Sequence, residues 1–170
     1  MLCATMSGHA HHKHDAGPVG CAVITVSDTR TAETDGSGRR IHELLRDQGH
    51  RVEHYQIVKD EPEQIVAVLR AMPATVEVVL INGGTGLARR DTTYEAVQRL
   101  LDKEITGFGE LFRMLSYEQI GAAAMLSRAT AGVAGRHVLF SIPGSTAAVE
   151  LAMTTLILPQ LAHVVGLVRG

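Results

Sequence analysis

The sequence predicts an α/β fold: a single three-layer domain in which a mainly parallel, mixed sheet is covered by helices on both faces. Three observations support this prediction. Short apolar, β-branched runs alternate with segments of helical periodicity, which is typical of βαβ units. The 170 residues suit one compact domain with a sizeable core. Hydrophobic residues make up 45% of the chain and aromatic residues only 4%, so we expect a mostly aliphatic interior.

The first elements are a strand, a helix and a second strand. The run CAVITVSD at 21–28 is apolar and rich in β-branched residues, which predicts a buried strand. A polar, glycine-containing loop is expected over 29–40. Helical spacing of apolar residues begins at Ile41, and Gly49 suits the C-cap of that helix. The alternation in RVEHYQIV at 51–58 predicts the second strand.

The middle of the chain is predicted to hold another strand among three helices. One apolar helical face runs from Ile65 to Met72 and precedes a strand at 76–81, VEVVLI. The next apolar stripe lies within 96–101, and a further helix is expected at 107–121. The apolar side of that last helix is expected to carry Phe108, Leu111, Phe112 and Leu115.

The end of the chain predicts a hairpin followed by helix. Residues 127–142, SRATAGVAGRHVLFSI, hold two short strands around Ala134 and Gly135. A helix is expected after the PGST segment at 143–146, with a break at Pro159 and a last amphipathic segment beyond it.

Composition argues against several functional classes as the main role of the protein. The net charge is −2 and no block of like charge stands out, so we expect no nucleic-acid partner. Cys3 and Cys21 are the only cysteines, too few for a disulfide framework and without metal-ligand spacing. We see no apolar run near the roughly 20 residues of a membrane span and no signal-peptide pattern. We therefore expect a cytoplasmic protein without a membrane partner.

Residues 1–17 are predicted to be a tail, with the domain at 18–170. The tail holds four closely spaced histidines: His9, His11, His12 and His14. Metal capture and a solvated polar tail are both compatible with this cluster, and we favour the solvated tail.

Three predicted strand ends carry small or polar residues. They are Ser27 and Asp28 after the first strand, the segment Gly83, Gly84, Thr85 and Gly86 after the third, and Pro143, Gly144 and Ser145 after the last. In parallel sheets, ligands bind beyond the carboxyl ends of the strands, where the strand order reverses. These segments therefore predict one ligand site.

The glycines of the segment 83–86 suit a phosphate cradle. Glycine allows positive φ and a close approach of the backbone to a ligand, and successive N–H groups can form an anion site. Arg89 and Arg90 would add positive charge. An ordinary tight turn is the alternative, because the pattern is neither a Walker A loop nor GxGxxG. Similarly, Ser145 or Thr146 suits the cap of the last long helix, and its N–H groups suit a second anion site.

Asp91 is the carboxylate most suited to a metal beside phosphate. Asp is a favoured N-cap, but Thr92 and Glu95 match the capping-box pattern T-x-x-E and can fill that role instead. Mg²⁺ typically uses one or two carboxylates together with phosphate oxygens, so Asp91 is the first candidate and Asp60 the second. Asp60 also suits a solvated turn. The residues alone therefore predict a magnesium-dependent site for a phosphorylated or nucleotide ligand.

The motifs TVSDTR, DGSG, GGTGLARRDTT, GFGELFRMLS, SRATAGV and PGST, in this order from Cys21 onward, resemble the molybdenum-cofactor biosynthesis family of MoaB/MogA type, which is related to the G domain of gephyrin. The GFGELFRMLSYEQIG and PGSTAA segments are most similar to the MoaB branch. The resemblance implies a mixed-sheet α/β fold that binds molybdopterin and, in active members, adenylylates it with MgATP. It also implies a homo-oligomer, a trimer or a hexamer, and other cofactor-pathway proteins as partners.

By the same resemblance, Asp91 is the main catalytic and magnesium-associated acid, and Asp60 assists it. Asn82 stands where many relatives have Thr. The substrate-binding candidates are Ser27, Asp28, Asn82, Gly83, Gly84, Thr85, Gly86, Glu110, Ser127, Arg128, Pro143, Gly144 and Ser145. Two alternatives to an adenylyltransferase stay open at this point: a molybdopterin-binding protein without turnover, and an oligomeric scaffold.

Overall fold

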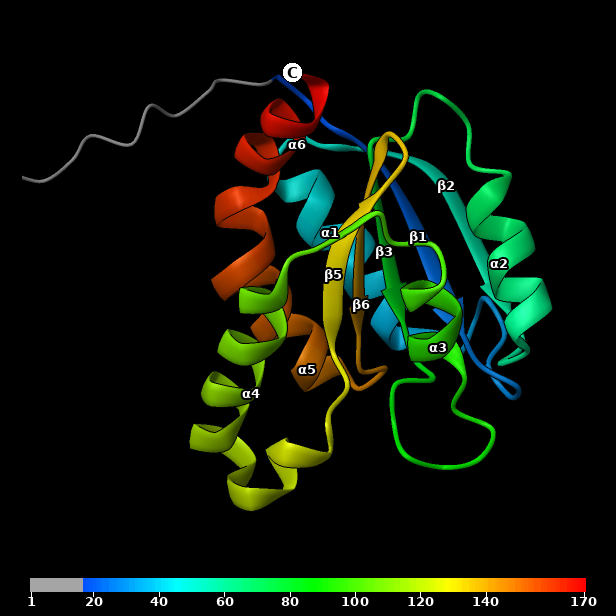
Figure 1. The fold of residues 1–170 in the computed structure, drawn as a ribbon, viewed down its shortest axis with the longest axis vertical. Helices are drawn as coiled ribbons and strands as arrows, with labels where there is room; N and C mark the ends of the chain where they lie inside the picture. Colours follow the sequence, from blue (N-terminus) through cyan, green and yellow to red (C-terminus); the bar gives the residue numbers. More distant parts are fainter. Residues whose placement is uncertain (1–16) are drawn as a thin grey trace, which may run out of the picture.

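The computed structural model describes residues 17–170 and contains one six-stranded sheet flanked by helices (Figure 1). The predicted tail and its histidines lie outside the described residues, apart from Gly17. The strands are β1 (Gly20–Val26), β2 (Arg51–Val58), β3 (Val78–Asn82), β4 (Lys103–Glu104), β5 (Thr130–Ala134) and β6 (His137–Ile142). The α-helices are α1 (Gly36–Asp47), α2 (Pro62–Arg70), α3 (Thr93–Gln98), α4 (Thr106–Ile120), α5 (Thr146–Leu151) and α6 (Leu161–Arg169). Three tighter or wider turns join them: 3₁₀ turns η1 (Gly121–Leu126) and η3 (Leu158–Gln160), and a π-turn η2 (Ala152–Ile157).

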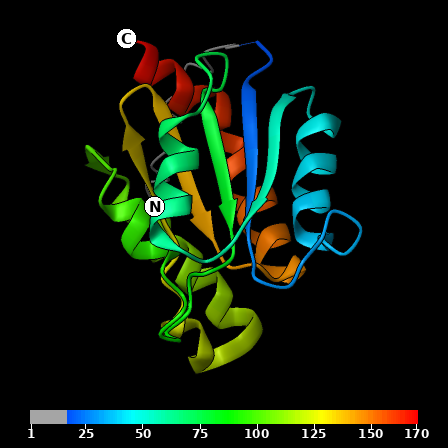
Figure 2. The same cartoon turned by 90° about the vertical axis from the view of Figure 1, so that its right-hand side faces the viewer.

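The sheet is mixed and mainly parallel, as predicted. Its strand order is β2-β1-β3-β6-β5-β4, and β2, β1, β3 and β6 are parallel. Strand β5 runs antiparallel to both of its neighbours (Figure 2). The predicted hairpin is confirmed, because Ala134 pairs with His137 across the turn. Strand β4 was not expected, since two residues are too short for a periodic signal.

Alternate residues of the central strands enter two separate cores, which makes three layers. Cys21 and Val23 of β1 join a core with α1, α4 and the α5–α6 segment. Ala22 and Ile24 of the same strand face α2 and α3. Figure 1 shows these two groups of helices on opposite sides of the sheet. The three-layer prediction is thus confirmed.

Helix α1 begins earlier than the apolar pattern predicted. The loop expected at 29–40 ends at Asp35, whose carboxylate caps the helix by accepting from the Gly38 N–H at 3.0 Å. The first turn of α1 packs on polar side chains at the strand ends, and so it lacks the apolar spacing that begins at Ile41. The prediction of that boundary was therefore wrong by about one helical turn.

The expected break at Pro159 is also wrong. The chain stays helical from Thr146 to Arg169, because η2 and η3 accommodate a proline that has no N–H to donate. This 24-residue stretch has a mean hydropathy of 1.8 in its most apolar window, which is enough by length and composition to cross a membrane. One such helix is weak evidence for a span. Of that window 28% is buried, and the buried residues belong to the core with α1 and α4.

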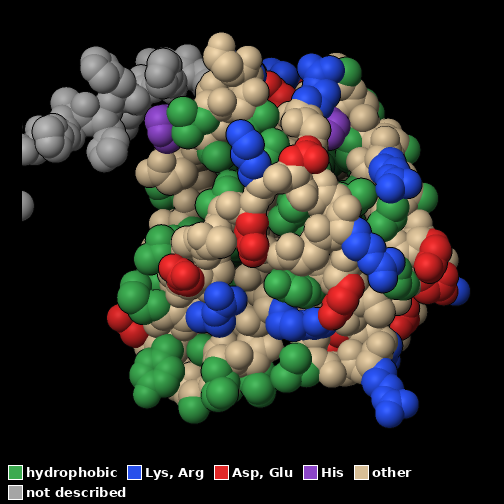
Figure 3. Space-filling view, viewed as in Figure 1, with side chains coloured by type: hydrophobic (Ala, Val, Ile, Leu, Met, Phe, Trp, Pro, Cys, Tyr) green, Lys and Arg blue, Asp and Glu red, His purple; other side chains and the backbone are tan. Residues whose placement is uncertain are grey.

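The apolar residues of α4 divide between the core and the surface. Phe108 and Phe112 are buried, and Phe108 packs edge-on against Phe140 of β6. Leu111, expected on the same face, is 46% exposed. It belongs to an exposed apolar group on α4 and η1, visible at the lower left of Figure 3: Leu111, Met114, Tyr117, Ile120, Met125 and Leu126.

Candidate functional site

The predicted ligand segments meet at the carboxyl ends of the parallel strands. In the sheet, β2 lies on one side of β1 and β3 lies on the other. The strand order therefore reverses between β1 and β3. The segment after β3 contacts the end of β6, because the Gly83 N–H donates to the Ile142 carbonyl at 3.0 Å. The Gly83 Cα also faces Gly144: a Cβ added to Gly144 would lie 3.2 Å from it. The loops after β3 and β6 are therefore packed together.

Two cavities open at this edge and share Gly84. The larger, of about 350 Å³, combines the glycine segments with an apolar wall from α4, η1 and α5. It is lined by Gly84, Thr85, Gly86, Phe112, Ser116, Gln119, Ile120, Leu126, Ser127, Pro143, Gly144, Ser145, Ala147, Ala148 and Leu151. The smaller, of about 140 Å³, carries three carboxylates: its lining is Val26, Ser27, Asp28, Thr29, Asp60, Gly84, Arg90 and Asp91.

Close packing explains the glycines at the junction. Gly83 and Gly84 have φ values of +109° and +63°, which side chains disfavour. A Cβ on Gly83 would lie 2.2 Å from the Val26 carbonyl oxygen. A Cβ on Gly84 would lie 2.1 Å from Thr93 Oγ1 and 2.4 Å from Asp60 Oδ2. The absence of side chains thus lets the segment pass between β1 and the acids of the smaller cavity.

Asp91 lies beside this segment and closes a turn of its own. The Ala88 N–H donates to Asp91 Oδ2 at 3.0 Å, and the Asp91 N–H donates to the Ala88 carbonyl at 2.8 Å. The position of a Gly86 Cβ is 2.6 Å from Asp91 Oδ2. The carboxylate is partly exposed and lines the smaller cavity, so one face of it stays open to a ligand.

The predicted capping box is wrong, because both of its members bind elsewhere. Thr92 makes no side-chain cap for α3; its N–H and its hydroxyl both donate to Asp60 Oδ1 at 2.9 Å. Glu95 instead forms an ion pair with Arg128. Asp60 is thus more than a solvated turn residue. Burial raises the pKa of Asp60. The two hydrogen bonds donated by Thr92 lower it, and the nearby charges of Asp91 and Asp28 raise it further.

Arg128 fixes the segment after β3 instead of facing the cavity. Its guanidinium donates to the carbonyls of Thr85 and Asp91, at 3.4 and 2.8 Å, and stacks over the Tyr94 ring at 5.1 Å. With its ion pair to Glu95, each of its three side-chain nitrogens has a partner within the protein. Arg128 was predicted to bind substrate, but its placement favours closure of this loop.

The residues of the smaller cavity fit a magnesium ion. Among residues 17–170 no group of three or more His, Cys, Asp or Glu side chains is close enough to hold a metal alone. The available donors are hard oxygens: the carboxylates of Asp28, Asp60 and Asp91. The buried Thr93 Oγ1 has no hydrogen-bond partner and faces the same side of Gly84 as Asp60 Oδ2. Such a set suits a cation held by one or two carboxylates together with ligand and water oxygens.

A buried polar network lies directly behind the site. Asp35 is fully buried, and its oxygens accept from Thr25 at 2.5 Å, Gly38 at 3.0 Å and Tyr55 at 2.8 Å. Burial raises the pKa of Asp35, but its hydrogen bonds outweigh this effect, so its pKa is lowered overall. Burial and the hydrogen bond that Tyr55 donates to Asp35 together raise the pKa of Tyr55 to about 12. The hydrogen bonds therefore favour the ionised form of Asp35.

Asn82 belongs to this network, which corrects its expected role. Its side chain is fully buried; Oδ1 accepts from Ser37 at 2.7 Å, and Nδ2 donates to Thr25 Oγ1 at 2.9 Å. With both ends occupied, the side chain does not reach the ligand cavities and instead joins β3 to α1. The prediction of direct substrate contact through this side chain is therefore wrong.

The prediction for Glu110 is corrected as well, because this residue is exposed on α4 and does not line either cavity at the site.

Sequence reasoning missed the apolar wall of the larger cavity, formed by Phe112, Ile120, Leu126 and Leu151. The helical periodicity of 107–121 gave a partial signal, but Phe112 was predicted only as part of the apolar side of that helix. Ser127, Pro143, Gly144 and Ser145 do line the larger cavity.

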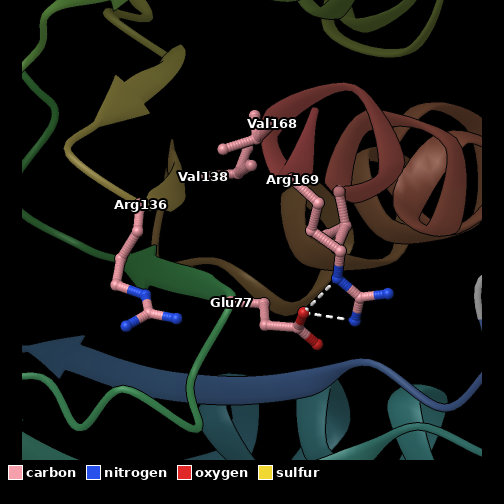
Figure 4. A pocket seen from close by; sticks show the side chains of 6 residues that line it. Glu77, Arg136, Val138, Val168 and Arg169 are labelled. Carbon is pink, nitrogen blue, oxygen red and sulfur yellow. Dashed lines mark hydrogen bonds and ion pairs between the residues drawn. The ribbon is translucent and has the colours of Figure 1, made fainter.

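A further cavity of about 340 Å³ lies at the opposite, amino ends of β3 and β6 (Figure 4). Its lining includes Arg136, three valines and the ion pair between Arg169 and Glu77. The second oxygen of Glu77 accepts from the Gly20 N–H at 3.2 Å, so this carboxylate is already satisfied. None of the predicted ligand segments contributes to this cavity, and the site at the carboxyl ends is the better candidate.

Comparisons with known proteins give matches over most of this chain. Residues 22–163 match the family model described as a probable molybdopterin binding domain. Molybdenum cofactor biosynthesis protein B of Bacillus cereus is 57% identical over 162 residues, which cover 94% of this chain and 96% of that protein. A crystal structure of molybdenum cofactor biosynthesis protein B superposes with a TM-score of 0.88 at 56% identity, over 91% of this chain and 98% of the other. The tungsten cofactor synthesizing protein MoaB from Pyrococcus furiosus superposes with a TM-score of 0.79 at 40% identity, over 90% and 98% of the two chains.

Proposed function

This chain belongs to the MoaB/MogA family of molybdenum cofactor biosynthesis proteins, and from that premise we propose that it adenylylates molybdopterin with MgATP. The products are adenylyl-molybdopterin and pyrophosphate. One observation carries the proposal: at Gly84, a cavity with apolar walls meets a smaller cavity with three carboxylates. Such a pair suits a reaction between a flat, phosphorylated heterocycle and a metal-bound nucleotide.

The larger cavity suits the pterin and its phosphate. Phe112, Ile120 and Leu126 offer apolar contact to a ring system. The backbone around Gly84 and Gly144 offers N–H groups to a phosphate. The Cβ-free surfaces of these glycines allow the ligand to approach the backbone closely.

The reaction is a displacement at the α-phosphorus of ATP. A phosphate oxygen of molybdopterin forms the new P–O bond, the bond from the α-phosphorus to the bridging oxygen breaks, and pyrophosphate leaves with that electron pair. Catalysis of this type depends mainly on positioning and on neutralising charge. Magnesium, when bound, would neutralise the phosphate oxygens. Asp91 and Asp60 would hold it, and Thr92 keeps Asp60 oriented through its two hydrogen bonds.

Molybdopterin-dependent release of pyrophosphate from ATP tests the proposal. The assay needs purified protein, Mg²⁺ and molybdopterin, with reactions lacking each component as controls. Release that requires both substrates and yields adenylyl-molybdopterin supports an adenylyltransferase. Molybdopterin binding without release would replace the proposal with a binding protein, and no binding of either substrate would leave an oligomeric scaffold.

We also propose that the chain forms a homo-oligomer, a trimer or a hexamer. The family resemblance implies such an assembly. The six exposed apolar residues on α4 and η1 are consistent with a buried interface, because contiguous apolar surface is costly to leave in water.

A further inference from the structure

Arg30 joins the loop after β1 to the loop after β6. Its Nη2 donates to the Gly144 carbonyl at 2.8 Å, across 114 positions of sequence. Its Nη1 donates to the Ser37 hydroxyl and lies 3.4 Å from Asp35 Oδ1. Among the described residues, this is the only side chain from another element that bonds to the backbone of Pro143, Gly144 or Ser145. Arg30 itself does not line the larger cavity, whereas those three residues do.

The bond to Gly144 fixes the orientation of a peptide group at the site. The described residues contain no cis peptide bond, so the Gly144 carbonyl and the Ser145 N–H point in opposite directions. With the carbonyl directed toward Arg30, the Ser145 N–H is directed away from it. This N–H has no acceptor within the part of the chain that the structure describes. An unsatisfied N–H beside a cavity is suited to bind an anion.

We propose that Arg30 is a positioning residue: it holds the Gly144–Ser145 peptide so that the Ser145 N–H faces the larger cavity and binds a phosphate oxygen of the ligand. This inference rests on the proposed function for the identity of the ligand. It adds a residue that touches no substrate and acts through the backbone of the loop.

The buried network makes Arg30 a rigid support. Asp35 is fully buried, and its carboxylate accepts from groups on β1, α1 and β2. Ser37, which accepts from Arg30, in turn donates to the buried Asn82 at 2.7 Å. A planar guanidinium can bind Gly144, Ser37 and Asp35 together, whereas an ammonium group has no such fork. The geometry of the loop therefore depends on arginine and not only on positive charge.

The test compares Arg30→Met and Arg30→Lys with Arg46→Met. Arg46 lies on the exposed side of α1 and has no side-chain contact with the loop, so its substitution removes the same charge without touching the support. The first readout is the amide NMR signal and hydrogen exchange of Ser145 in the ligand-free protein. The second is the affinity for molybdopterin. Thermal melting shows that each variant is folded.

We expect the Ser145 amide signal to shift in both Arg30 variants and to stay unchanged in Arg46→Met. Molybdopterin affinity should fall about tenfold in Arg30→Met, which corresponds to about 1.4 kcal/mol. Arg30→Lys should keep less than half of the wild-type affinity despite its charge. An unchanged Ser145 signal in folded Arg30→Met would overturn the proposal, as would full wild-type affinity in Arg30→Lys. If the wild type binds no molybdopterin, the proposed function fails, and the Ser145 signal still decides whether Arg30 positions the peptide.

Discussion

Gly84→Ala is the substitution that the geometry of the site constrains most closely. Gly84 has φ +63°, and its Cβ would lie 2.1 Å from Thr93 Oγ1 and 2.4 Å from Asp60 Oδ2. Gly49 supplies a matched control: its φ is +78°, and a Cβ there has no atom within 4 Å. Both substitutions place an L-residue at positive φ, but only Gly84→Ala brings its Cβ too close to neighbouring atoms.

The expected free energies of unfolding follow from these two contributions. An L-residue in the left-handed region costs roughly 1–2 kcal/mol, so the free energy of unfolding should fall by this amount in both variants. Forcing extra atoms into a packed region adds typically about 1–3 kcal/mol at Gly84. Asp60 cannot move aside freely, because Oδ1 accepts two hydrogen bonds from Thr92. Gly84→Ala should therefore lose about 1–3 kcal/mol more than Gly49→Ala.

Urea unfolding followed by circular dichroism measures both variants. The difference should appear as a lower midpoint at an unchanged slope, because the surface exposed on unfolding stays the same. If the two variants lose the same free energy, the close packing of Gly84 against Thr93 and Asp60 is refuted as the reason for glycine at this position.

Two further predictions follow from the acids and from the surface. Folding raises the pKa of Asp60, so the folded protein favours the protonated carboxyl. The stability that this group contributes is present below its unfolded pKa and is lost as pH rises through its folded pKa. Asp60→Asn should therefore be at least as stable as the wild type at pH 7. Any gain should be no more than about 1 kcal/mol, because the group is partly exposed, and adenylylation should fall. A clear loss of stability in thermal melts at pH 7 would contradict this prediction. Size-exclusion chromatography with light scattering should give a trimer or a hexamer, and Met114→Glu on the exposed side of α4 should weaken any assembly that uses this surface more than Glu118→Gln does; a wild-type monomer at micromolar concentration would refute the oligomer.

The sequence was sufficient for β1, β3 and β6, because their buried apolar runs are bounded by glycine or polar residues. For the mostly exposed β2, the alternation in 51–58 was sufficient. The sequence was also sufficient to bring the three strand ends together, since parallel strands end at one edge. The start of α1 was missed because Asp35 and Ser37 pair with distant side chains, and no local spacing encodes such contacts. The continuous helix from Thr146 to Arg169 was missed for another reason: the π-helical turn η2 and the 3₁₀ turn η3 accommodate Pro159 within it.

The capping box shows the same limit at the site. Thr92 and Glu95 have the correct spacing, yet Asp60 and Arg128 bind them instead. These partners lie 32 and 33 positions away, so a local pattern could not identify them. Asn82 is the converse case. It is the last residue of the apolar strand β3, beside a ligand segment, but its amide bonds to groups inside the protein.

The ratio of adenylylation rates of Asp91→Asn and wild type, at saturating ATP and molybdopterin, tests the central claim most directly. Asparagine keeps an oxygen for the Ala88 N–H, so the turn and the fold should survive. It removes the charge that we propose acts beside the magnesium and the phosphates. If the carboxylate acts mainly in the transition state, the rate should fall at least about 100-fold, or about 2.7 kcal/mol, while molybdopterin affinity changes far less. A folded variant with the wild-type, magnesium-dependent rate would contradict the account.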